Sequence, residues 1–416
     1  MRGEERVPEE ESSITPTLGD NGPVSPLPPL VEPAAELSRA EVARYSRHLL
    51  IPDLGVAGQK RLKNARVLVI GAGGLGSPAL LYLAAAGVGT LGIVDFDVVE
   101  ESNLQRQIIH GQSDIGRLKA ESARDSISEL NPLVTVCVHP LRLESGNAVE
   151  LFAEYDLIID GTDNFATRYL VNDAAVLAGK PYVWGSVYRF QGQVAVFWED
   201  APDGPGGEKR GLNYRDLYPE PPPPGTVPSC AEGGVLGILC ASIASVMGTE
   251  AIKLITGIGE PLLGRLLIYD ALPMSYRTIT VRKDPAAPPI TGLVDYEAFC
   301  GTGAPETPTD SSVTPRELRD LLDSGAAIAL IDVRERAEWD ICHIKGAKLI
   351  PKATLESGQG PALLPAGLIP VLYCKSGARS AQALAALQRA GVTGALHLRG
   401  GIVGWAEQFE PDMAMY

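Results

Sequence analysis

The chain has 416 residues, 45% of them hydrophobic, and a formal net charge of −15. This length predicts two domains plus tails, and so acidic a chain is expected to bind neither nucleic acid nor a membrane surface. Six scattered cysteines without a C-x-x-C pair favour reduced thiols over a disulfide framework or a zinc ribbon. No uncharged apolar run is long enough to span a bilayer, and the N-terminus does not read as a targeting peptide, so we expect a cytoplasmic protein.

The first predicted element is an acidic, proline-rich tail over residues 1–36, whose composition favours disorder. A helix is predicted to begin after Ser38, whose hydroxyl can cap it while Glu41 completes a capping box. Across residues 37–283 short apolar runs alternate with helical ones, which predicts a Rossmann-like mixed α/β sheet with helices on both faces. Strands are expected at 66–70, 90–95, 134–138, 156–160, 181–186, 190–198, 265–270 and 276–282, and helices at 75–87, 117–130, 146–153, 165–178 and 237–255.

Two stretches rich in proline and glycine interrupt this rhythm. Residues 200–229 predict a long mobile loop, and residues 284–313 predict a linker between domains. Residues 314–416 then repeat the α/β rhythm on a smaller scale and predict a second, smaller α/β domain. Its strands are expected at 328–332, 371–374 and 395–398, and its helices at 315–323, 379–390 and 401–408.

A glycine-rich turn is the first candidate site. Gly71, Gly73 and Gly76 satisfy G-x-G-x-x-G between a predicted strand and helix, and Asp95 ends the next strand. This is the dinucleotide fingerprint, in which the glycines let the backbone approach phosphate and the carboxylate binds ribose hydroxyls. An NAD-dependent oxidoreductase is therefore one interpretation.

Two cations further along the chain favour a triphosphate instead. Arg106 and Lys119 supply positive charge that a dinucleotide does not require, whereas a triphosphate that loses pyrophosphate needs it where negative charge develops. Asp163 follows an apolar strand at the usual ligand edge of such a sheet and suits Mg²⁺, which takes oxygen donors. Taken singly, Asp95 could cap a helix and Arg106 could form a surface ion pair.

Several separated segments match one family, at 44–47, 71–76, 95–97, 102–106, 119, 162–164, 230–234 and 269–271. Through them residues 38–283 resemble the MoeB/ThiF/HesA superfamily of ubiquitin-activating-like adenylyltransferases. The resemblance implies that ATP and Mg²⁺ are used to adenylate the C-terminal Gly-Gly carboxylate of a ubiquitin-like sulfur carrier protein. It also implies a homodimer, in which Arg47 reaches the triphosphate of the neighbouring subunit. The residues implied in binding MgATP are Arg47, Gly71, Gly73, Gly74, Gly76, Asp95, Ser102, Asn103, Leu104, Gln105, Arg106, Lys119, Asp163 and Asn164, with Asp163 on the metal.

The chain departs from this family at its zinc site. Many relatives hold a structural zinc between two C-x-x-C pairs. Here residues 213–216 read Asn-Tyr-Arg-Asp, and residues 284–288 contain no cysteine. Because tetrahedral zinc needs about four sulfur or nitrogen donors, we expect no zinc.

A second candidate site begins at Cys374, which follows an apolar strand and precedes Lys375, Ser376, Gly377, Ala378 and Arg379. Loop amides before a helix, together with the two cations, favour a thiolate and would stabilise a persulfide anion. The pattern alone fits a phosphatase-like anion cradle or a sulfur-transfer loop. The arginine comes one residue earlier than in Cys-x5-Arg, which favours sulfur.

Further matches at 332–335, 343–347, 400–401 and Trp405 make residues 314–410 resemble a rhodanese domain. This implies a persulfide on Cys374, loaded by a donor such as thiosulfate or a cysteine desulfurase. The two-domain order resembles the MoeZ-type fusion of molybdopterin synthesis, in which the carrier becomes a thiocarboxylate. A non-catalytic scaffold with a decayed rhodanese module is the other class of function left open.

The remaining cysteines differ in expected role. Cys230 lies between the predicted loop and an apolar helix, where relatives attack the adenylate or resolve a sulfur intermediate; a purely structural thiol is the alternative. Cys137 and Cys240 fall in apolar patterns and are expected in the core. Asp332 and Arg334 are expected to brace the Cys374 loop.

Overall fold

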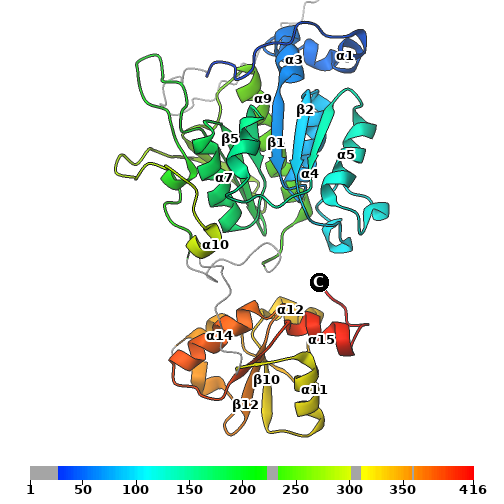
Figure 1. Ribbon diagram of the computed structural model, residues 1–416, viewed down its shortest axis with the longest axis vertical. Coiled ribbons are helices and arrows are strands. Elements are labelled where there is room, and N and C mark those ends of the chain that lie inside the picture. The colour runs from blue at the N-terminus through cyan, green and yellow to red at the C-terminus, as the bar shows by residue number, and fades with distance from the viewer. Residues whose placement is uncertain (1–26, 223–232, 301–310, 358–359) are drawn as a thin grey trace, which may run out of the picture.

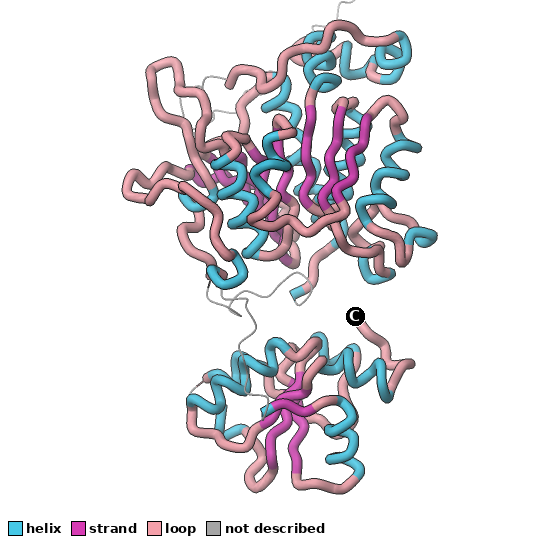
Figure 2. The backbone as a smooth tube through the Cα atoms, in the orientation of Figure 1, coloured by secondary structure: helices cyan, strands magenta, loops and turns pink. Residues whose placement is uncertain are grey.

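The computed structural model describes residues 27–222, 233–300, 311–357 and 360–416 (Figures 1 and 2). The expected fold class is confirmed. An eight-stranded mixed sheet carries helices on both faces, and a smaller α/β unit is built on a five-stranded sheet.

The order of strands in the large sheet determines where a ligand can bind. The five strands β3, β2, β1, β4 and β5 are parallel, and β6 to β8 continue the sheet antiparallel. The chain moves outward from β1 to β3 and then returns to β4 on the other side of β1, so the gap between β1 and β4 is a topological switch point. In sheet order the strands are β3 (Thr135–His139), β2 (Thr90–Val94), β1 (Arg66–Ile70), β4 (Leu157–Asp160), β5 (Tyr182–Tyr188), β6 (Gln191–Phe197), β7 (Arg265–Asp270) and β8 (Ser275–Thr280).

Alternation along the central strands divides the core into two layers. Val67 and Val69 of β1 join the core on one face, whereas Leu68 and Ile70 join the core on the other, because successive side chains of a strand point to opposite faces. Helices α3 (Gly55–Asn64), α4 (Gly76–Ala86), α5 (Lys119–Leu130) and α9 (Gly237–Thr256) pack into the first layer, and α6 (Ala148–Ala153) and α7 (Phe165–Leu177) into the second. By length and composition α9 could cross a membrane, but it is a helix of the core that contacts β5 and β6.

The first domain extends beyond its expected limits at both ends. Leu27 and Val31, assigned by composition to the tail, are buried, and the Leu30 amide donates to the Leu254 carbonyl at 2.9 Å. At the other end Tyr296 and Cys300, assigned to the linker, are also buried in the first domain. Apolar side chains therefore order both segments, although their surroundings are rich in proline. Residues 1–26 and 301–310 lie outside the described residues.

The segment expected to form a loop over residues 200–229 is anchored near its middle. Trp198 and Leu212 form an antiparallel bridge, and Tyr214 is buried in an aromatic cluster with Trp184. Residues 223–229 lie outside the described residues. At the N-terminal side, the predicted capping box is confirmed, since the Glu41 amide donates to Ser38 Oγ at 3.2 Å at the start of α1 (Arg39–Arg44).

In the second domain all strand pairs are parallel, in the order β11, β10, β12, β13, β9. The predicted strands and helices correspond to β10 (Ile328–Asp332), β12 (Ile369–Tyr373), β13 (Leu396–Leu398), α11 (Pro315–Asp323), α14 (Ala378–Arg389) and α15 (Gly401–Phe409). The elements not predicted are short: β9 (Ser312–Val313), β11 (Lys348–Leu349), α12 (Arg336–Ile341) and α13 (Lys352–Glu356).

Candidate active sites

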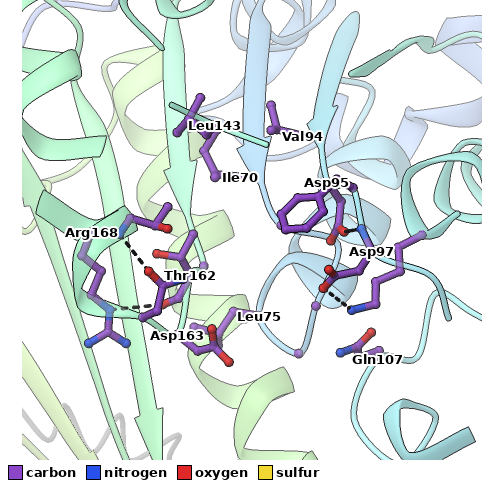
Figure 3. A pocket seen from close by; sticks show the side chains of 18 of the residues that line it. Ile70, Leu75, Val94, Asp95, Asp97, Gln107, Leu143, Thr162, Asp163 and Arg168 are labelled. Carbon is purple, nitrogen blue, oxygen red and sulfur yellow. Dashed lines mark hydrogen bonds and ion pairs between the residues drawn. The ribbon is translucent and has the colours of Figure 1, made fainter. Parts of the chain in front are cut away.

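A pocket lies at the C-terminal ends of β1, β2 and β4, at the switch point of the large sheet (Figure 3). The sequence placed its candidate residues far apart along the chain, and the fold brings eight of them into one wall. These are Gly71, Gly73, Gly74, Asp95, Arg106, Lys119, Asp163 and Asn164.

The glycine loop is held rigidly against the start of α4. Gly71 has φ +87°, and a Cβ on Gly76 would lie 1.8 Å from the Gly71 carbonyl oxygen, so a side chain is excluded there. The Ala72 amide donates to Asp95 Oδ2 at 2.8 Å, and the Ala72 carbonyl accepts from His110 Nε2 at 3.1 Å. The loop amides and the helix N-terminus are thereby pre-oriented for an anion.

Asp95 connects the loop to the next segment of the pocket. Its Oδ1 accepts from the Asp97 amide at 2.9 Å, while its Oδ2 holds Ala72. Burial raises the pKa of Asp95, although the two backbone donors and nearby Lys119 oppose that rise. The carboxylate thus braces the site, and its remaining lone pairs are the ones available to a ribose.

The cations approach from the side of Asp95. Lys119 is 7% exposed, and its Nζ lies 3.0 Å from Asp97 Oδ2. The Lys119 amide also donates to the Asp97 carbonyl at 2.9 Å. Arg106 Nη1 donates to the Ser102 carbonyl at 3.1 Å, which directs the arginine along its own turn. Both side chains line the pocket, so two positive charges face the same volume as the loop amides.

Asp163 stands on the opposite wall of the pocket (Figure 3). The buried Asp160 Oδ1 accepts from Thr162 Oγ1 at 2.7 Å and fixes the turn that presents Asp163. Arg168 Nε donates to the Thr162 carbonyl at 3.1 Å on the same turn. The Asp163 side chain is exposed, and among the described residues it has no hydrogen-bond partner. One free carboxylate beside a phosphate site is a donor set that suits Mg²⁺, which completes its shell with phosphate and water.

In the second domain Cys374 follows β12 and is 1% exposed. The Gly377 amide donates to Cys374 Sγ at 3.1 Å, and Gly377 takes φ +104° to direct it there. At the start of α15 the Ile402 amide donates to the Cys374 carbonyl at 2.8 Å, and a Cβ on Gly401 would lie 2.5 Å from that oxygen. Glycine at 401 therefore lets the helix dock onto the loop.

The two cations of the Cys374 loop, Lys375 and Arg379, contact other side chains and not the sulfur. Arg379 forms two hydrogen bonds of 2.7 Å with Glu338. Lys375 Nζ lies 4.6 Å from the centre of the Tyr416 ring. Asp332 and Arg334, which were expected to brace this loop, form a buried ion pair in which Arg334 Nη2 lies 2.6 Å from Asp332 Oδ2. The Gly377 amide is thus the donor that contacts the sulfur, while Arg379 and Lys375 contact Glu338 and Tyr416.

Comparison with known proteins identifies the family of each domain. Residues 45–288 match the ThiF family, and residues 314–408 match the rhodanese-like domain. The chain belongs to the ThiF family.

Two relatives match nearly the whole chain, and a third matches about two thirds of it. Over 393 residues the chain is 74% identical to the probable adenylyltransferase/sulfurtransferase MoeZ of Mycobacterium tuberculosis, covering 94% of this chain and 99% of that protein. It is 40% identical over 429 residues to the adenylyltransferase and sulfurtransferase MOCS3 of Mus musculus, covering 95% and 91%. A sulfur carrier protein adenylyltransferase of Thermus thermophilus is 53% identical over 271 residues, covering 64% of this chain and 98% of that protein.

Among solved structures, the crystal structure of E. coli MccB is similar, with a TM-score of 0.52. It is 20% identical and covers 62% of this chain and 74% of that chain. At this identity the likeness concerns the fold of the ThiF-family domain alone.

Not every predicted nucleotide-binding residue of the ThiF-family domain lines the pocket. Asn103 is buried, and its Oδ1 accepts from the Glu100 amide at 3.2 Å to shape a turn. Arg47 is exposed on α2 (Ser46–Leu49), which contacts α1 and α3, and it does not line the pocket. Cys230 lies outside the described residues. The other predicted residues away from the wall are Gly76, Ser102, Leu104 and Gln105.

Several residues that line the ThiF-family pocket were not among the predicted site residues, among them Arg168, Gln107 and Cys240. Arg168 lies one helical turn after Asn164, and its Nη2 donates to Ser186 Oγ at 3.0 Å. Gln107 Oε1 is buried without a hydrogen-bond partner among the described residues. Cys240, expected in the core, is buried and also lies against Gly74 in the wall. Of these three residues only Arg168 could have been predicted, because it lies four residues after Asn164 and therefore on the same face of the helix.

Charged side chains join residues 213–216 to residues 283–284, the region at which the sequence analysis expected no zinc. Lys283 Nζ lies 2.6 Å from Glu199 Oε2 and 3.3 Å from Asp216 Oδ2. Asn213 Nδ2 donates to Glu199 Oε2 at 2.7 Å, and the Asp284 amide donates to Asp216 Oδ1 at 3.1 Å. An ammonium group at the centre of two carboxylates does not fit tetrahedral zinc. Ion pairs and hydrogen bonds therefore link these two segments.

Proposed function

We propose that this enzyme activates a ubiquitin-like sulfur carrier with ATP and then transfers sulfur to it from a persulfide on Cys374. One observation carries the proposal: a single pocket at the switch point combines anion-binding loop amides, the cations Arg106 and Lys119, and the free carboxylate of Asp163. Relatives that match nearly the whole chain are named adenylyltransferases and sulfurtransferases, which supports both halves.

In the first step, an oxygen of the carrier's C-terminal glycine carboxylate attacks the α-phosphorus of ATP. The bond from that phosphorus to the bridging oxygen breaks, so an acyl-adenylate forms and pyrophosphate leaves. Arg106 and Lys119 offset the negative charge that builds up on the departing phosphates. Arg47 of a neighbouring subunit supplies a further positive charge. Mg²⁺ held at Asp163 would share that charge when bound.

In the second step, the outer sulfur of the Cys374 persulfide attacks the carbonyl carbon of the acyl-adenylate. The bond to AMP breaks, and carrier and enzyme become joined by an acyl disulfide. The Cys230 thiolate then attacks the Cys374 sulfur, which releases the carrier thiocarboxylate and leaves a disulfide between the two cysteines. A reducing thiol reopens that disulfide for the next cycle.

The chemistry defines the partners. The carrier ends in Gly-Gly, as the resemblance to the MoeB/ThiF/HesA superfamily implies. Sulfur comes from thiosulfate or a cysteine desulfurase, and the enzyme acts as a homodimer in the cytoplasm. The thiocarboxylate serves synthesis of the molybdenum cofactor and related sulfur-containing metabolites.

Intact-mass spectrometry tests this function. A ubiquitin-like carrier is incubated with the enzyme, ATP, Mg²⁺, thiosulfate and a reducing thiol. We expect one oxygen of the carrier to be replaced by sulfur in the full mixture and in none of those lacking ATP or thiosulfate. A carrier that lacks its last glycine is the control and stays unchanged. An unmodified Gly-Gly carrier in the full mixture, with enzyme shown to be folded, would contradict the proposal.

A further inference from the structure

We propose that Tyr416 is a positioning residue of the sulfur-transfer site, which holds Lys375 in place for an anionic sulfur donor. The inference rests on the proposed function of Cys374. It concerns a side chain that the motifs of the sequence did not single out, at the end of the segment that follows α15.

The phenol of Tyr416 is anchored on both sides. Its hydroxyl donates to Glu338 Oε1 at 2.5 Å and accepts from Arg334 Nη1 at 2.8 Å. Arg334 is itself fixed by the buried Asp332. Burial raises the pKa of Tyr416, and its hydrogen bond to Glu338 raises it further, so the phenol keeps its proton and remains a donor at neutral pH. The ring therefore has one defined position.

Glu338 connects this anchor to the end of the Cys374 loop. Both of its oxygens accept from Arg379, so the arginine charge is balanced by a carboxylate. Burial would raise the pKa of Glu338, but hydrogen bonds from Arg379 and Tyr416 outweigh it and lower the pKa. Arg334 and Asp332 form a second balanced pair. Two of the three cations around the loop are thus neutralised by partners.

Lys375 is the cation that remains. Its Nζ lies 4.6 Å from the centre of the Tyr416 ring, within the range of a cation–π contact. Among the described residues it has no ion-pair partner. A ring attracts an ammonium group without cancelling its charge, so Lys375, the residue that follows Cys374, is held in place and keeps its positive charge.

This arrangement matters for a donor such as thiosulfate, which carries two negative charges. The Cys374 thiolate attacks the outer sulfur of thiosulfate, a new sulfur–sulfur bond forms, and the old one breaks to release sulfite. When cyanide is supplied as the acceptor, it takes the outer sulfur of the persulfide as thiocyanate and regenerates the thiolate. A fixed Lys375 attracts the dianion before the first step, so its position affects donor binding more than the chemical step.

Thiosulfate-to-cyanide sulfur transfer by the full chain tests the proposal. In Tyr416→Ala, which removes ring and phenol, we expect the KM for thiosulfate to rise about five-fold with kcat within about two-fold of wild type. In Tyr416→Phe, which keeps the ring but loses its anchor, we expect a smaller rise of about two-fold. In a Lys375→Met background, Tyr416→Ala should raise the KM no further, because the two side chains act through one contact.

Met415→Ala is the matched control, since Met415 is the exposed neighbour of Tyr416 and should leave the KM unchanged. A wild-type KM in Tyr416→Ala would overturn the proposal. So would a KM increase that persists unchanged in the Lys375→Met background, which would show a general structural role. If the wild-type chain transfers no sulfur from thiosulfate but forms carrier thiocarboxylate with a cysteine desulfurase, this proposal is overturned and the proposed function of Cys374 stands. No transfer from either donor would contradict the proposed function itself.

Discussion

Lys119 Nζ lies 3.0 Å from Asp97 Oδ2 at the edge of the nucleotide pocket. The lysine is buried, whereas the Asp97 side chain is 53% exposed, so water screens the pair from one side. The contact holds the ammonium group in place before any nucleotide arrives. A phosphate can then take over the lysine at little cost, because a half-exposed carboxylate is easily solvated.

Replacing this lysine tests its role in the first step. We expect Lys119→Met to lower carrier-dependent exchange between ATP and pyrophosphate about 100-fold, because a charge that stabilises the leaving pyrophosphate is lost. The measurement is incorporation of labelled pyrophosphate into ATP. Lys209→Met is the matched control, since that lysine is 85% exposed and pairs with Asp203 away from the pocket. Equal exchange in the two variants would exclude the role.

Asp163 offers a test of metal binding. We expect Asp163→Asn to lower the same exchange about 100-fold and to raise the Mg²⁺ concentration needed for half-maximal activity, because the free carboxylate is the proposed ligand. Titration of Mg²⁺ at fixed ATP measures this. Asp203→Asn is the control and should show the wild-type Mg²⁺ dependence. An unchanged Mg²⁺ requirement in Asp163→Asn would contradict the assignment.

Replacing Cys374 should stop sulfur transfer and leave adenylation unchanged. We expect Cys374→Ser to keep wild-type pyrophosphate exchange and to form no thiocarboxylate, because the thiol lies in the second domain and takes no part in adenylation. Mass spectrometry of the carrier reports the second reaction. Cys137→Ser, on β3 of the first domain, should perform both reactions and controls for loss of a thiol. Thiocarboxylate formed by Cys374→Ser would show that another cysteine of the enzyme carries the persulfide.

The ion-pair cluster at Lys283 should stabilise the first domain in place of a metal. We expect Lys283→Met to lower the free energy of unfolding by about 1–3 kcal/mol, because Asp216, whose side chain is 1% exposed, loses its cation. Thermal unfolding measures this as a shift of about 2–4 °C for each kcal/mol. Lys209→Met again serves as control. The wild-type melting temperature should not change with EDTA, and a large drop on chelation would show that a metal holds these segments.

Asp160 predicts a pH dependence of stability. It is fully buried with Oδ2 unpaired among the described residues, and burial raises its pKa from 3.8 to about 6. The folded state therefore retains a proton that the unfolded state has released, so the stability contributed by this group falls as pH rises from about 4 to about 6. The melting temperature of Asp160→Asn relative to wild type should rise across that window and then stay constant. A difference that is independent of pH would contradict the raised pKa.

Much of the fold follows from local patterns in the sequence. The central strands are short apolar runs rich in β-branched residues, and the predicted strand at 66–70 has the same limits in the structure. The limits of the first domain could not be predicted in this way, because Val31 and Tyr296 are single apolar residues in proline-rich surroundings. Their burial depends on a groove that other parts of the chain create. The two-residue strands of the second domain are likewise too short to leave a periodic signal.

The candidate sites were predictable to the extent that backbone chemistry fixes them. The glycine loop and Asp95 could be recognised because the turn itself demands those residues. Arg168 and Tyr416 could not, since each acts through contacts between segments distant in the sequence. Arg379 was expected beside the sulfur, yet it pairs with Glu338, an acidic residue that no local pattern connects with Cys374.

The central claim is that Arg106, Lys119 and Asp163 surround a triphosphate whose outer two phosphates are displaced by a peptide carboxylate. A crystal structure of the chain with Mg²⁺ and a non-hydrolysable ATP analogue tests it most directly. We predict the phosphates against the amides of Gly73 and Gly74, with Arg106 and Lys119 on their oxygens and the metal on Asp163. Phosphates bound elsewhere, or these three side chains turned away from them, would contradict the account.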